Sequence, residues 1–381
     1  MQEEKWDIFC SVIDNYGDIG VCWRLARQLA DERRRRVRLW VDRLVPFHRI
    51  CPEIDPSLGR QMLRGVDIRL WTDPLPEAEA ADVVIEAFAC ALPERYVAAM
   101  AARARKPVWI NLEYLSAEEW VQGCHGLASP HPSLSLIKHF FFPGFVSGTG
   151  GVACERNLAE RRKAFQGNKE ALAAFWQSLG LPQQQPDEAR VSLFCYPNPA
   201  VEALFSVWAQ DSRKVVCLVP EGVAREAIDA SFAPASLSGA GSVMSRGSLQ
   251  VRILPFLEQD LYDRLLWACD CNFVRGEDSF LRAQWASRPL VWHIYPQEDE
   301  AHRIKLEAFL RLYCAALTQD AAAGLRALWT AWNHKSAAGE SWAGFWRHRA
   351  ALEAHAGKWC ENLLKNGDLA SNLVKFCADR L

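Results

Sequence analysis

Residues 8–30 constrain the fold of this chain most, and they read IFCSVIDNYGDIGVCWRLARQLA. The apolar start is typical of a buried strand, and from Val21 onward apolar residues recur at helical spacing. Between the two lies a loop in which Asp14 and Asp18 flank Gly17. A strand, a glycine loop and a helix form the first half of an α/β crossover, and such loops lie where open parallel sheets bind ligands. The segment therefore predicts an α/β domain with a ligand site at this loop.

The two carboxylates in the loop are unusual, because a phosphate-binding loop carries glycines at this place and no acid. Two interpretations of Asp18 stay open. Its side chain either caps the helix by accepting hydrogen bonds from the first main-chain amides, or it has a catalytic role. The two roles are compatible with each other.

Strand-like and helical segments alternate through the rest of the chain, which is typical of parallel sheets covered by helices. In the first half we expect strands at 36–42, 66–71, 82–88 and 107–112 and helices at 92–103 and 171–179. A proline-bracketed linker, 180–186, precedes a second series, with strands at 191–196, 215–220, 251–256, 271–275 and 289–295 and helices at 199–210, 259–269 and 280–287. From residue 298 to the end of the chain the sequence pattern is helical. We therefore predict two Rossmann-like domains, 1–180 and 187–360, and a helical segment, 361–381, that packs back on the first domain.

Composition narrows the class of protein. A chain of 381 residues that is 50% hydrophobic can bury two ordinary cores. The net charge of -2 gives no overall attraction to nucleic acid or to an anionic membrane. The 13 cysteines have no paired spacing, and neither a signal peptide nor an apolar run of about 20 residues is visible. We expect a soluble cytoplasmic protein with reduced thiols and without a nucleic-acid or membrane partner.

Two further acids, Glu86 and Glu113, lie at or just beyond the ends of predicted strands of the first half. Strand ends of one parallel sheet meet at one edge, so both acids could share a cleft with Asp14 and Asp18. For Glu86 we favour the simpler interpretation of a solvated loop acid. The glycine-rich segments 144–151 and 236–248 are expected to be mobile loops, since no Lys-Ser/Thr follows the first of them.

Motifs for metal, nucleotide and nucleophile sites are missing from the sequence. It contains no HExxH, CxxC, GxSxG, GxxxxGK[ST] or complete GxGxxG, and Cys269 and Cys271 are too close together for a zinc site. We therefore expect neither a metal nor a cofactor.

The segment 272–280, NFVRGEDSF, repeats the pattern of a strand, a glycine turn and a helix. Asp278 and Ser279 fall at expected capping positions, and a helix N-terminus offers main-chain amides to an anion. Arg275 adds a forked donor suited to a diphosphate, unless it only pairs with Glu277. An acidic loop in one domain and an anion site in the other are typical of an enzyme that uses a nucleotide-activated substrate.

Five segments resemble one family closely: DNYGDIGVCWRLARQL, EAFACALP, NLEYLSAEEW, LFCYPNPA and FVRGEDSFLRAQWA. The chain is similar, essentially from end to end, to the EarP family of protein-arginine rhamnosyltransferases. The resemblance implies a GT-B fold, with two Rossmann-like domains facing each other across a cleft. It also implies inverting, metal-independent transfer of L-rhamnose from TDP-β-L-rhamnose to an arginine of bacterial translation elongation factor P.

The resemblance also assigns roles to residues. The second aspartate of the DNYGD motif, Asp18, is the expected general base, and Asp14 supports it. From the chemistry of the residues we add Glu113 as a third catalytic acid, and we assign Tyr16 and Gly17 to the donor site. Matching donor positions are Phe194, Tyr196, Gln259, Arg275, Glu277, Asp278, Ser279 and Tyr295. Tyr262 stands where the family has a phenylalanine near the thymine, so a ring is kept.

Two other classes of protein remain as alternatives. A nucleotide-sugar-binding or scaffold protein would need the donor pocket but not Asp18. A glycosyltransferase acting on a small molecule would keep both sites and would enclose its acceptor in an apolar pocket.

Overall fold

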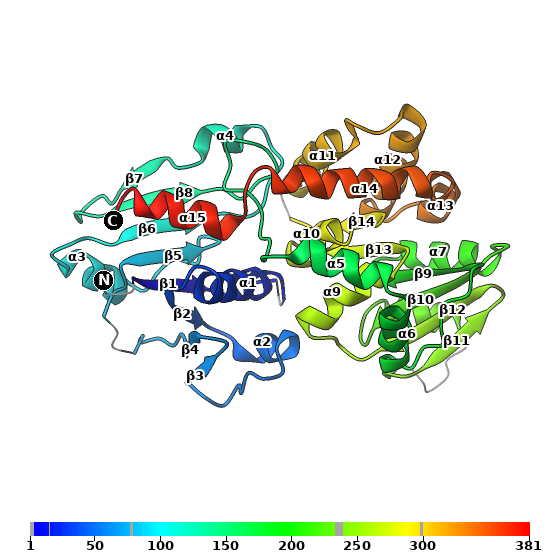
Figure 1. Ribbon diagram of the computed structural model, residues 1–381, viewed down its shortest axis with the longest axis horizontal. Coiled ribbons are helices and arrows are strands. Elements are labelled where there is room, and N and C mark those ends of the chain that lie inside the picture. Colours follow the sequence, from blue (N-terminus) through cyan, green and yellow to red (C-terminus); the bar gives the residue numbers. More distant parts are fainter. Residues whose placement is uncertain (1–3, 15, 77–78, 233–238, 298–299) are drawn as a thin grey trace. The chain divides into compact units, whose positions relative to one another are not determined.

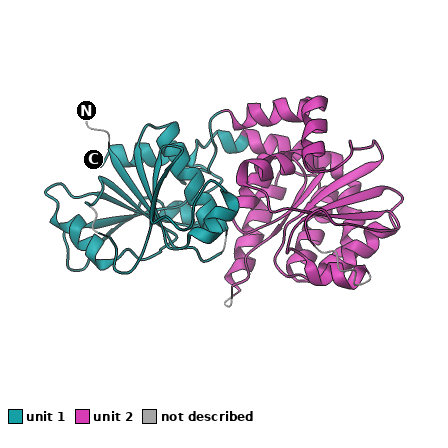
Figure 2. Ribbon diagram, turned by 90° about the horizontal axis from the view of Figure 1, so that it is seen from below, with its two compact units in different colours: residues 1–156, 362–381 teal, residues 157–361 magenta. Residues whose placement is uncertain are grey.

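The computed structural model describes residues 4–14, 16–76, 79–232, 239–297 and 300–381 (Figure 1). The chain divides into two compact units, residues 1–156 with 362–381 and residues 157–361 (Figure 2). Asn15 of the first loop and residue 298, where the sequence predicts the helical C-terminal part to begin, lie outside the described residues. Each unit is built on one sheet with helices around it, which confirms the predicted α/β class.

The first unit contains an eight-stranded sheet in the order β3-β4-β2-β1-β5-β6-β8-β7. The pairings from β4 to β8 are parallel, and β3 and β7 are antiparallel edge strands. Its strands are β1 (Lys5–Cys10), β2 (Arg36–Val41), β3 (Arg60–Leu63), β4 (Val66–Leu70), β5 (Val83–Ala87), β6 (Val108–Leu112), β7 (Ala128–Pro130) and β8 (Ile137–Phe141), and its helices are α1 (Gly17–Asp31), α2 (Leu44–Ile50), α3 (Glu94–Ala102), α4 (Trp120–Cys124) and α15 (Leu369–Ala378).

The central strands of this sheet are covered on both faces. Every residue of β5 and β6 is buried, as expected for strands between two helical layers. The crossovers through α1 and α3 run in opposite directions along the sheet, so their common right-handedness places the two helices on opposite faces. On the α3 face, Phe9, Val84 and Trp109 of the sheet pack against Tyr96 and Met100 of the helix.

The C-terminal residues 362–381 belong to the first unit, where they pack against the glycine-rich segment 144–151. Gly151 has φ +73°, and a Cβ there would lie 2.6 Å from the carbonyl oxygen of Gly367. The side-chain amide of Asn372 donates to the carbonyl of Gly150 at 3.1 Å. The expectation of a mobile loop at 144–151 is therefore wrong. Its glycines allow the close approach of another segment.

The second unit contains a six-stranded sheet in the order β11-β12-β10-β9-β13-β14, parallel except for the edge strand β11. Its strands are β9 (Glu188–Leu193), β10 (Lys214–Pro220), β11 (Val243–Arg246), β12 (Leu249–Leu254), β13 (Cys271–Arg275) and β14 (Leu290–His293). Its helices are α5 (Leu158–Gly167), α6 (Lys169–Ser178), α7 (Ala200–Ala209), α8 (Arg225–Ser231), α9 (Gln259–Ala268), α10 (Asp278–Trp285), α11 (Ala301–Cys314), α12 (Gln319–Asn333), α13 (Ala338–Arg347) and α14 (Arg349–Leu364), the last of which ends in the first unit. Strand β11 lies within 236–248, where the sequence predicts only a loop.

The units divide after Arg156 and not in the linker 180–186 at which the sequence predicts the boundary between 1–180 and 187–360. The reason is the packing of α5 and α6. Phe165 of α5 contacts the rings of Phe175 and Trp267 edge-on, at centroid distances of 5.6 and 5.9 Å. Phe175 and Trp176 of α6 are buried in the same cluster as Leu265 of α9. The two helices thus complete a core of the second unit.

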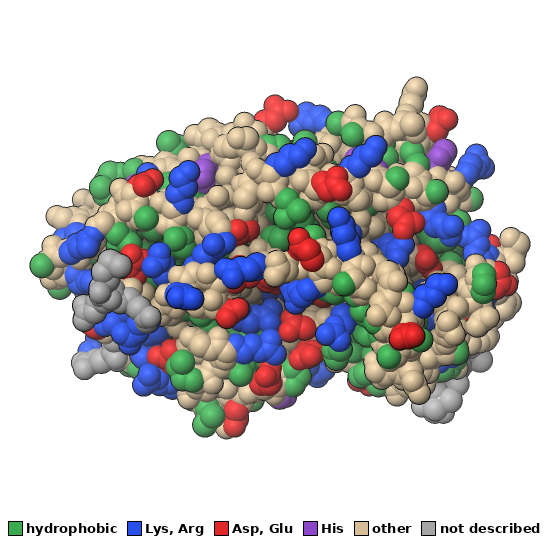
Figure 3. Space-filling model, in the orientation of Figure 1, with side chains coloured by type: hydrophobic (Ala, Val, Ile, Leu, Met, Phe, Trp, Pro, Cys, Tyr) green, Lys and Arg blue, Asp and Glu red, His purple; other side chains and the backbone are tan. Residues whose placement is uncertain are grey.

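Positive and negative side chains are mixed on the surface, as the small net charge leads one to expect. On the face drawn in Figure 3, Lys and Arg side chains are interspersed with Asp and Glu. Among the described helices, none combines the length and the apolar character that crossing a membrane requires.

Candidate active site

Asp18 lies in the first turn of α1 and is 2% exposed. The helix begins at Gly17, before the apolar periodicity starts at Val21, and its N-cap residue is Tyr16, which makes no side-chain capping bond. Oδ2 of Asp18 accepts hydrogen bonds from the main-chain amides of Ile13 and Asp14, at 2.8 and 2.9 Å. The capping interpretation of Asp18 is therefore wrong. The carboxylate holds the loop that precedes the helix.

The other oxygen of Asp18 connects this loop to a neighbouring strand end. Oδ1 accepts a hydrogen bond from the hydroxyl of Tyr114, just beyond β6, at 3.2 Å. The Tyr114 ring stacks on Phe88, just beyond β5, with ring centroids 4.4 Å apart. Residues that follow β1, β5 and β6 thus meet at Asp18, as the parallel sheet predicts.

Burial raises the pKa of the Asp18 carboxyl above its usual value, and the nearby charge of Asp14 acts in the same direction. The hydrogen bonds from the two amides and from Tyr114 act against this shift. A carboxylate with a raised pKa that stays fixed in position is a stronger base than an ordinary surface aspartate.

Asp14 and Glu113 are the other two predicted catalytic acids, and both are half-buried. The carbonyl of Asp14 accepts from the amide of Gly17 at 2.7 Å, and a Cβ at Gly17 would lie 3.0 Å from Oδ2 of Asp14. A glycine at this position therefore lets the Asp14 carboxylate lie close to the start of the helix. Glu113 precedes Tyr114 in the chain, and its carboxylate accepts a hydrogen bond from the side-chain amide of Asn111. The structure brings Asp14 and Asp18 together directly, whereas Glu113 is connected to Asp18 only as the chain neighbour of Tyr114.

Glu86, which we expected to be a solvated loop acid, is buried in the structure. It is 3% exposed, and its Oε2 lies 2.8 Å from Nζ of Lys138 and 3.0 Å from Nε1 of Trp109. The interpretation as a solvated loop acid is wrong, because the residue lies in β5 and points into the layer between the sheet and α3.

In the second unit, Arg275 at the end of β13 lies against two aromatic rings. Its guanidinium carbon is 4.4 Å from the ring centroid of Phe194 and 4.7 Å from that of Tyr196, two residues that follow β9. Nη1 donates to the carbonyl of Cys195 at 3.2 Å. Weakly hydrated guanidinium groups stack well on aromatic faces, so this arrangement fixes the orientation of the fork.

The N-terminus of α10 follows Arg275 directly. Asp278 and Ser279 are the first residues of the helix, and the N-cap is Glu277, without a side-chain capping bond. The Ser279 hydroxyl accepts from the Arg275 amide at 3.1 Å and donates to the Arg275 carbonyl, while Oδ2 of Asp278 accepts from Nε2 of Gln259 at 3.2 Å. The expected capping roles of Asp278 and Ser279 are therefore wrong. Their side chains hold the preceding turn and the neighbouring helix α9.

The remaining predicted donor residues surround the same strand ends. Tyr262 of α9 contacts Phe194 edge-on at 5.8 Å, and its buried hydroxyl has no hydrogen-bond partner among the described residues. Tyr295 is 45% exposed and contacts Tyr196 edge-on at 5.5 Å. The structure thus brings Arg275 and these aromatic residues into one cluster.

The sequence analysis missed His293, the last residue of β14. Its ring is 2% exposed and contacts Tyr196 edge-on at 5.3 Å. Burial lowers the pKa of His293 to about 3, with smaller contributions from the charges of Lys335 and Arg275, so the imidazole is neutral at physiological pH. The sequence predicts a strand over 289–295, so His293 lies inside that strand and carries no signal of a site residue.

Within the described ranges, no three or more His, Cys, Asp or Glu side chains are grouped so as to hold a metal ion. The two clusters offer complementary chemistry. The first unit presents carboxylates, which can bind and deprotonate a cationic group, and the second presents a guanidinium and helix amides, which can bind an anion.

Comparison with known proteins agrees with this chemistry. A family model described as elongation factor P (EF-P) rhamnosyltransferase EarP matches residues 6–378. A protein-arginine rhamnosyltransferase of Pseudomonas aeruginosa is 50% identical over 377 residues, covering 99% of this chain and 100% of the relative. One of Shewanella oneidensis is 44% identical and covers 97% of both chains.

A solved structure that describes EarP-mediated arginine glycosylation of elongation factor EF-P is similar over 100% of both chains, with 36% identity and a TM-score of 0.72. The likeness and the two mostly parallel sheets confirm the predicted GT-B type of fold. The chain therefore belongs to the EarP family of elongation factor P rhamnosyltransferases.

Proposed function

We propose that this chain transfers L-rhamnose from TDP-β-L-rhamnose to an arginine side chain of translation elongation factor P, with inversion at the anomeric carbon. Membership of the family supports the sugar, the arginine and the factor. The proposal includes a cytoplasmic location for the reaction. TDP as the nucleotide and inversion as the stereochemical course rest on the family resemblance and on the chemistry of the two clusters.

The observation that carries the proposal is the geometry of Asp18. Its carboxylate is buried, is held by two main-chain amides and Tyr114, and has a raised pKa. A free guanidinium has a pKa above about 12, so one carboxylate cannot keep it deprotonated at neutral pH. Asp18 instead orients the guanidinium and accepts its proton while the new bond forms.

The step conserves atoms and charge. A guanidinium nitrogen of the acceptor forms a bond to the anomeric carbon of rhamnose, and the bond from that carbon to the diphosphate oxygen breaks. The nitrogen's proton passes to Asp18, and the electron pair of the broken bond leaves with TDP. Asp14 and Glu113 bind the other guanidinium nitrogens and concentrate the lone pair on the attacking one.

The leaving TDP gains negative charge, which Arg275 and the first amides of α10 stabilise. The rings of Phe194 and Tyr196 hold the guanidinium of Arg275 in place for this task. Tyr262 and Tyr295 contact the thymine and ribose side of the donor, with Gln259, Glu277, Asp278 and Ser279 around them, while Tyr16 and Gly17 contact the sugar. These groups supply the charge stabilisation that a metal ion supplies in other transferases, so the reaction proceeds without one.

Incubation with TDP-β-L-rhamnose and unmodified elongation factor P, followed by intact-mass measurement of the factor, tests the proposal. We expect the factor to gain the mass of one deoxyhexose residue, and NMR of the product to show an α linkage. A protein that binds the donor and leaves the factor unchanged would be a binding protein. Transfer to small molecules alone would identify the small-molecule glycosyltransferase.

A further inference from the structure

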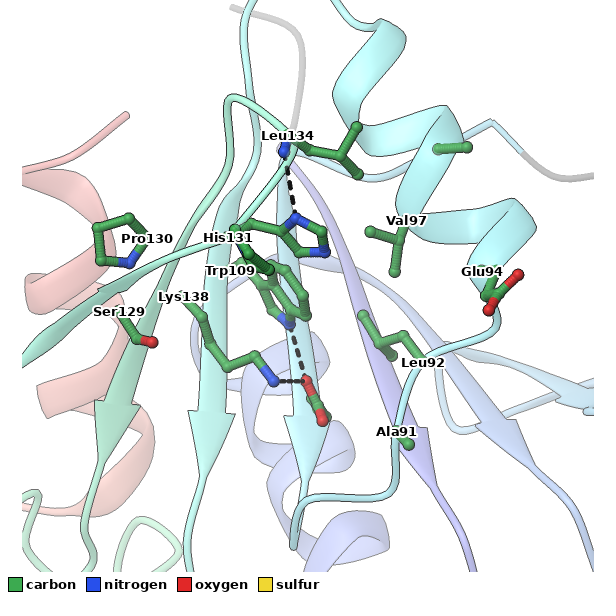
Figure 4. Close-up of a pocket in the computed structure, with 13 residues that line it drawn as sticks. Ala91, Leu92, Glu94, Val97, Trp109, Ser129, Pro130, His131, Leu134 and Lys138 are labelled. Atoms are coloured by element: carbon green, nitrogen blue, oxygen red, sulfur yellow. Dashed lines mark hydrogen bonds and ion pairs between the residues drawn. The ribbon is translucent and has the colours of Figure 1, made fainter.

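A pocket of about 540 Å³ opens in the first unit, on the α3 face of the sheet (Figure 4). Its floor is formed by Glu86, Trp109 and Lys138, from β5, β6 and β8. Val97 and Ala98 of α3 form one wall, and the turn between β7 and β8 forms the other. None of the residues assigned above to catalysis or to the donor lines it.

The charges in the pocket are only partly balanced. Oε2 of Glu86 contacts both Lys138 and Trp109, whereas its Oε1 accepts no hydrogen bond from a described residue. Glu94, in the first turn of α3, lines the same pocket and is exposed, and no described residue forms an ion pair with it. Two carboxylates and one ammonium group thus line the pocket, and that ammonium is already paired with Glu86.

The pocket's walls suit a long aliphatic chain. Leu92, Val97 and Leu134 lie along it (Figure 4). Lysine and arginine side chains bury their methylene stems against apolar surface while the charged head stays with polar partners. A basic side chain that enters here places its stem against these residues and its charged head beside a carboxylate of the pocket.

One loop links the pocket to Asp18. Residues 88–93 connect β5 to α3, and within them Phe88, Ala89 and Ala91 have φ of 56°, 53° and 53°, a left-handed backbone that non-glycine residues rarely adopt. Ala91 lines the pocket, while Phe88 stacks on the Tyr114 that donates to Asp18. Such strained residues persist only where surrounding contacts fix them, and they cluster at binding sites.

We propose that the pocket binds a second basic side chain, a lysine or arginine of the acceptor protein other than the arginine that receives the sugar. This inference rests on the proposed function. In the proposed function the acceptor arginine lies at Asp18, and the loop 88–93 connects that position to the pocket. Charge complementarity then fixes the orientation of the factor on the first unit.

The test measures binding of elongation factor P to the full chain by calorimetry. Ala98→Arg places the enzyme's own guanidinium in the pocket, and Ala102→Arg adds the same charge one turn further along α3, at an exposed position outside the pocket. We expect Ala98→Arg and Glu94→Lys to raise the Kd by at least about tenfold, as for an anchoring interface residue. Ala102→Arg should leave the Kd unchanged, and TDP affinity should be equal in all variants.

A double-mutant cycle identifies the partner. Each exposed lysine and arginine of the factor is changed to alanine and combined with Glu94→Gln and with Glu86→Gln. One of these residues should couple to both glutamates, so that its removal makes the glutamate substitutions silent. Equal affinities for Ala98→Arg and Ala102→Arg, or no coupled residue, would overturn the assignment while leaving the proposed function intact. Wild-type protein that fails to modify the factor would refute the proposed function first, and the pocket's assignment with it.

Discussion

Replacing Asp18 by asparagine and by alanine separates its structural task from its catalytic one. Asparagine keeps the shape of the side chain. Its oxygen can accept from the amides of Ile13 and Asp14, and its NH₂ group can donate to the hydroxyl oxygen of Tyr114. What asparagine cannot do is accept a proton from the acceptor.

The expected stabilities follow from these contacts. The raised pKa means that the folded protein holds the Asp18 proton more tightly than the unfolded chain, so ionisation at neutral pH opposes folding. Asp18→Asn removes that charge and should leave stability equal or slightly higher. Asp18→Ala removes all three hydrogen bonds, each worth about 1.5–3 kcal/mol with a charged acceptor. Because Ile13 is 65% exposed, water can replace part of them, and we expect a loss of about 2–4 kcal/mol.

The two variants should differ in stability, but both should lose activity. Both variants should lose at least the roughly 100-fold that general base catalysis usually contributes. TDP affinity should stay normal, since the assigned nucleotide contacts lie in the second unit. The assay combines chemical denaturation, calorimetric TDP affinity and single-turnover rhamnosylation of the factor. A folded Asp18→Asn protein that binds donor and turns over at nearly the wild-type rate would refute the catalytic assignment.

Three further predictions concern pH, the donor and metal ions. The transfer rate should fall as the pH falls through the raised pKa of Asp18, because the protonated acid cannot accept a proton. A pH–rate profile should therefore show an acid limb above the usual aspartate value of about 3.9, and a limb at or below that value would contradict the buried-base model. Arg275→Ala should weaken TDP binding by about 1–3 kcal/mol. Arg275→Lys should keep only part of the affinity, since a lysine lacks the planar fork. Unchanged calorimetric affinity for TDP would show that Arg275 does not bind the diphosphate. EDTA should not change the rate of transfer, and a loss that magnesium restores would show that a metal takes part.

Local patterns in the sequence were sufficient to predict the central elements. Short segments rich in apolar and β-branched residues next to turn residues predict β1, β5, β9 and β13, as is typical of strands buried between two helical layers. The edge strands β3, β7 and β11 were missed. They are three or four residues long, they alternate between exposed and half-buried positions, and they pair antiparallel with one neighbour, so their sequences resemble loops.

The candidate site was predictable in outline and not in its contacts. The rule that parallel strand ends converge was enough to associate Asp18 with the segment around Glu113. Whether Asp18 capped its own helix or held the preceding loop depended on where α1 starts, which the apolar periodicity from Val21 does not show. Likewise, the buried Glu86 forms an ion pair with Lys138 of β8, a strand that was not predicted.

The measurement that tests the central claim most directly is fragmentation mass spectrometry of elongation factor P after incubation with this protein and TDP-β-L-rhamnose. The account predicts a single deoxyhexose attached to an arginine side chain. It also predicts that the same factor with that arginine changed to lysine stays unmodified, since lysine lacks the guanidinium that Asp14, Asp18 and Glu113 orient. A factor without added sugar, or with sugar on a serine, threonine or asparagine, would contradict the account.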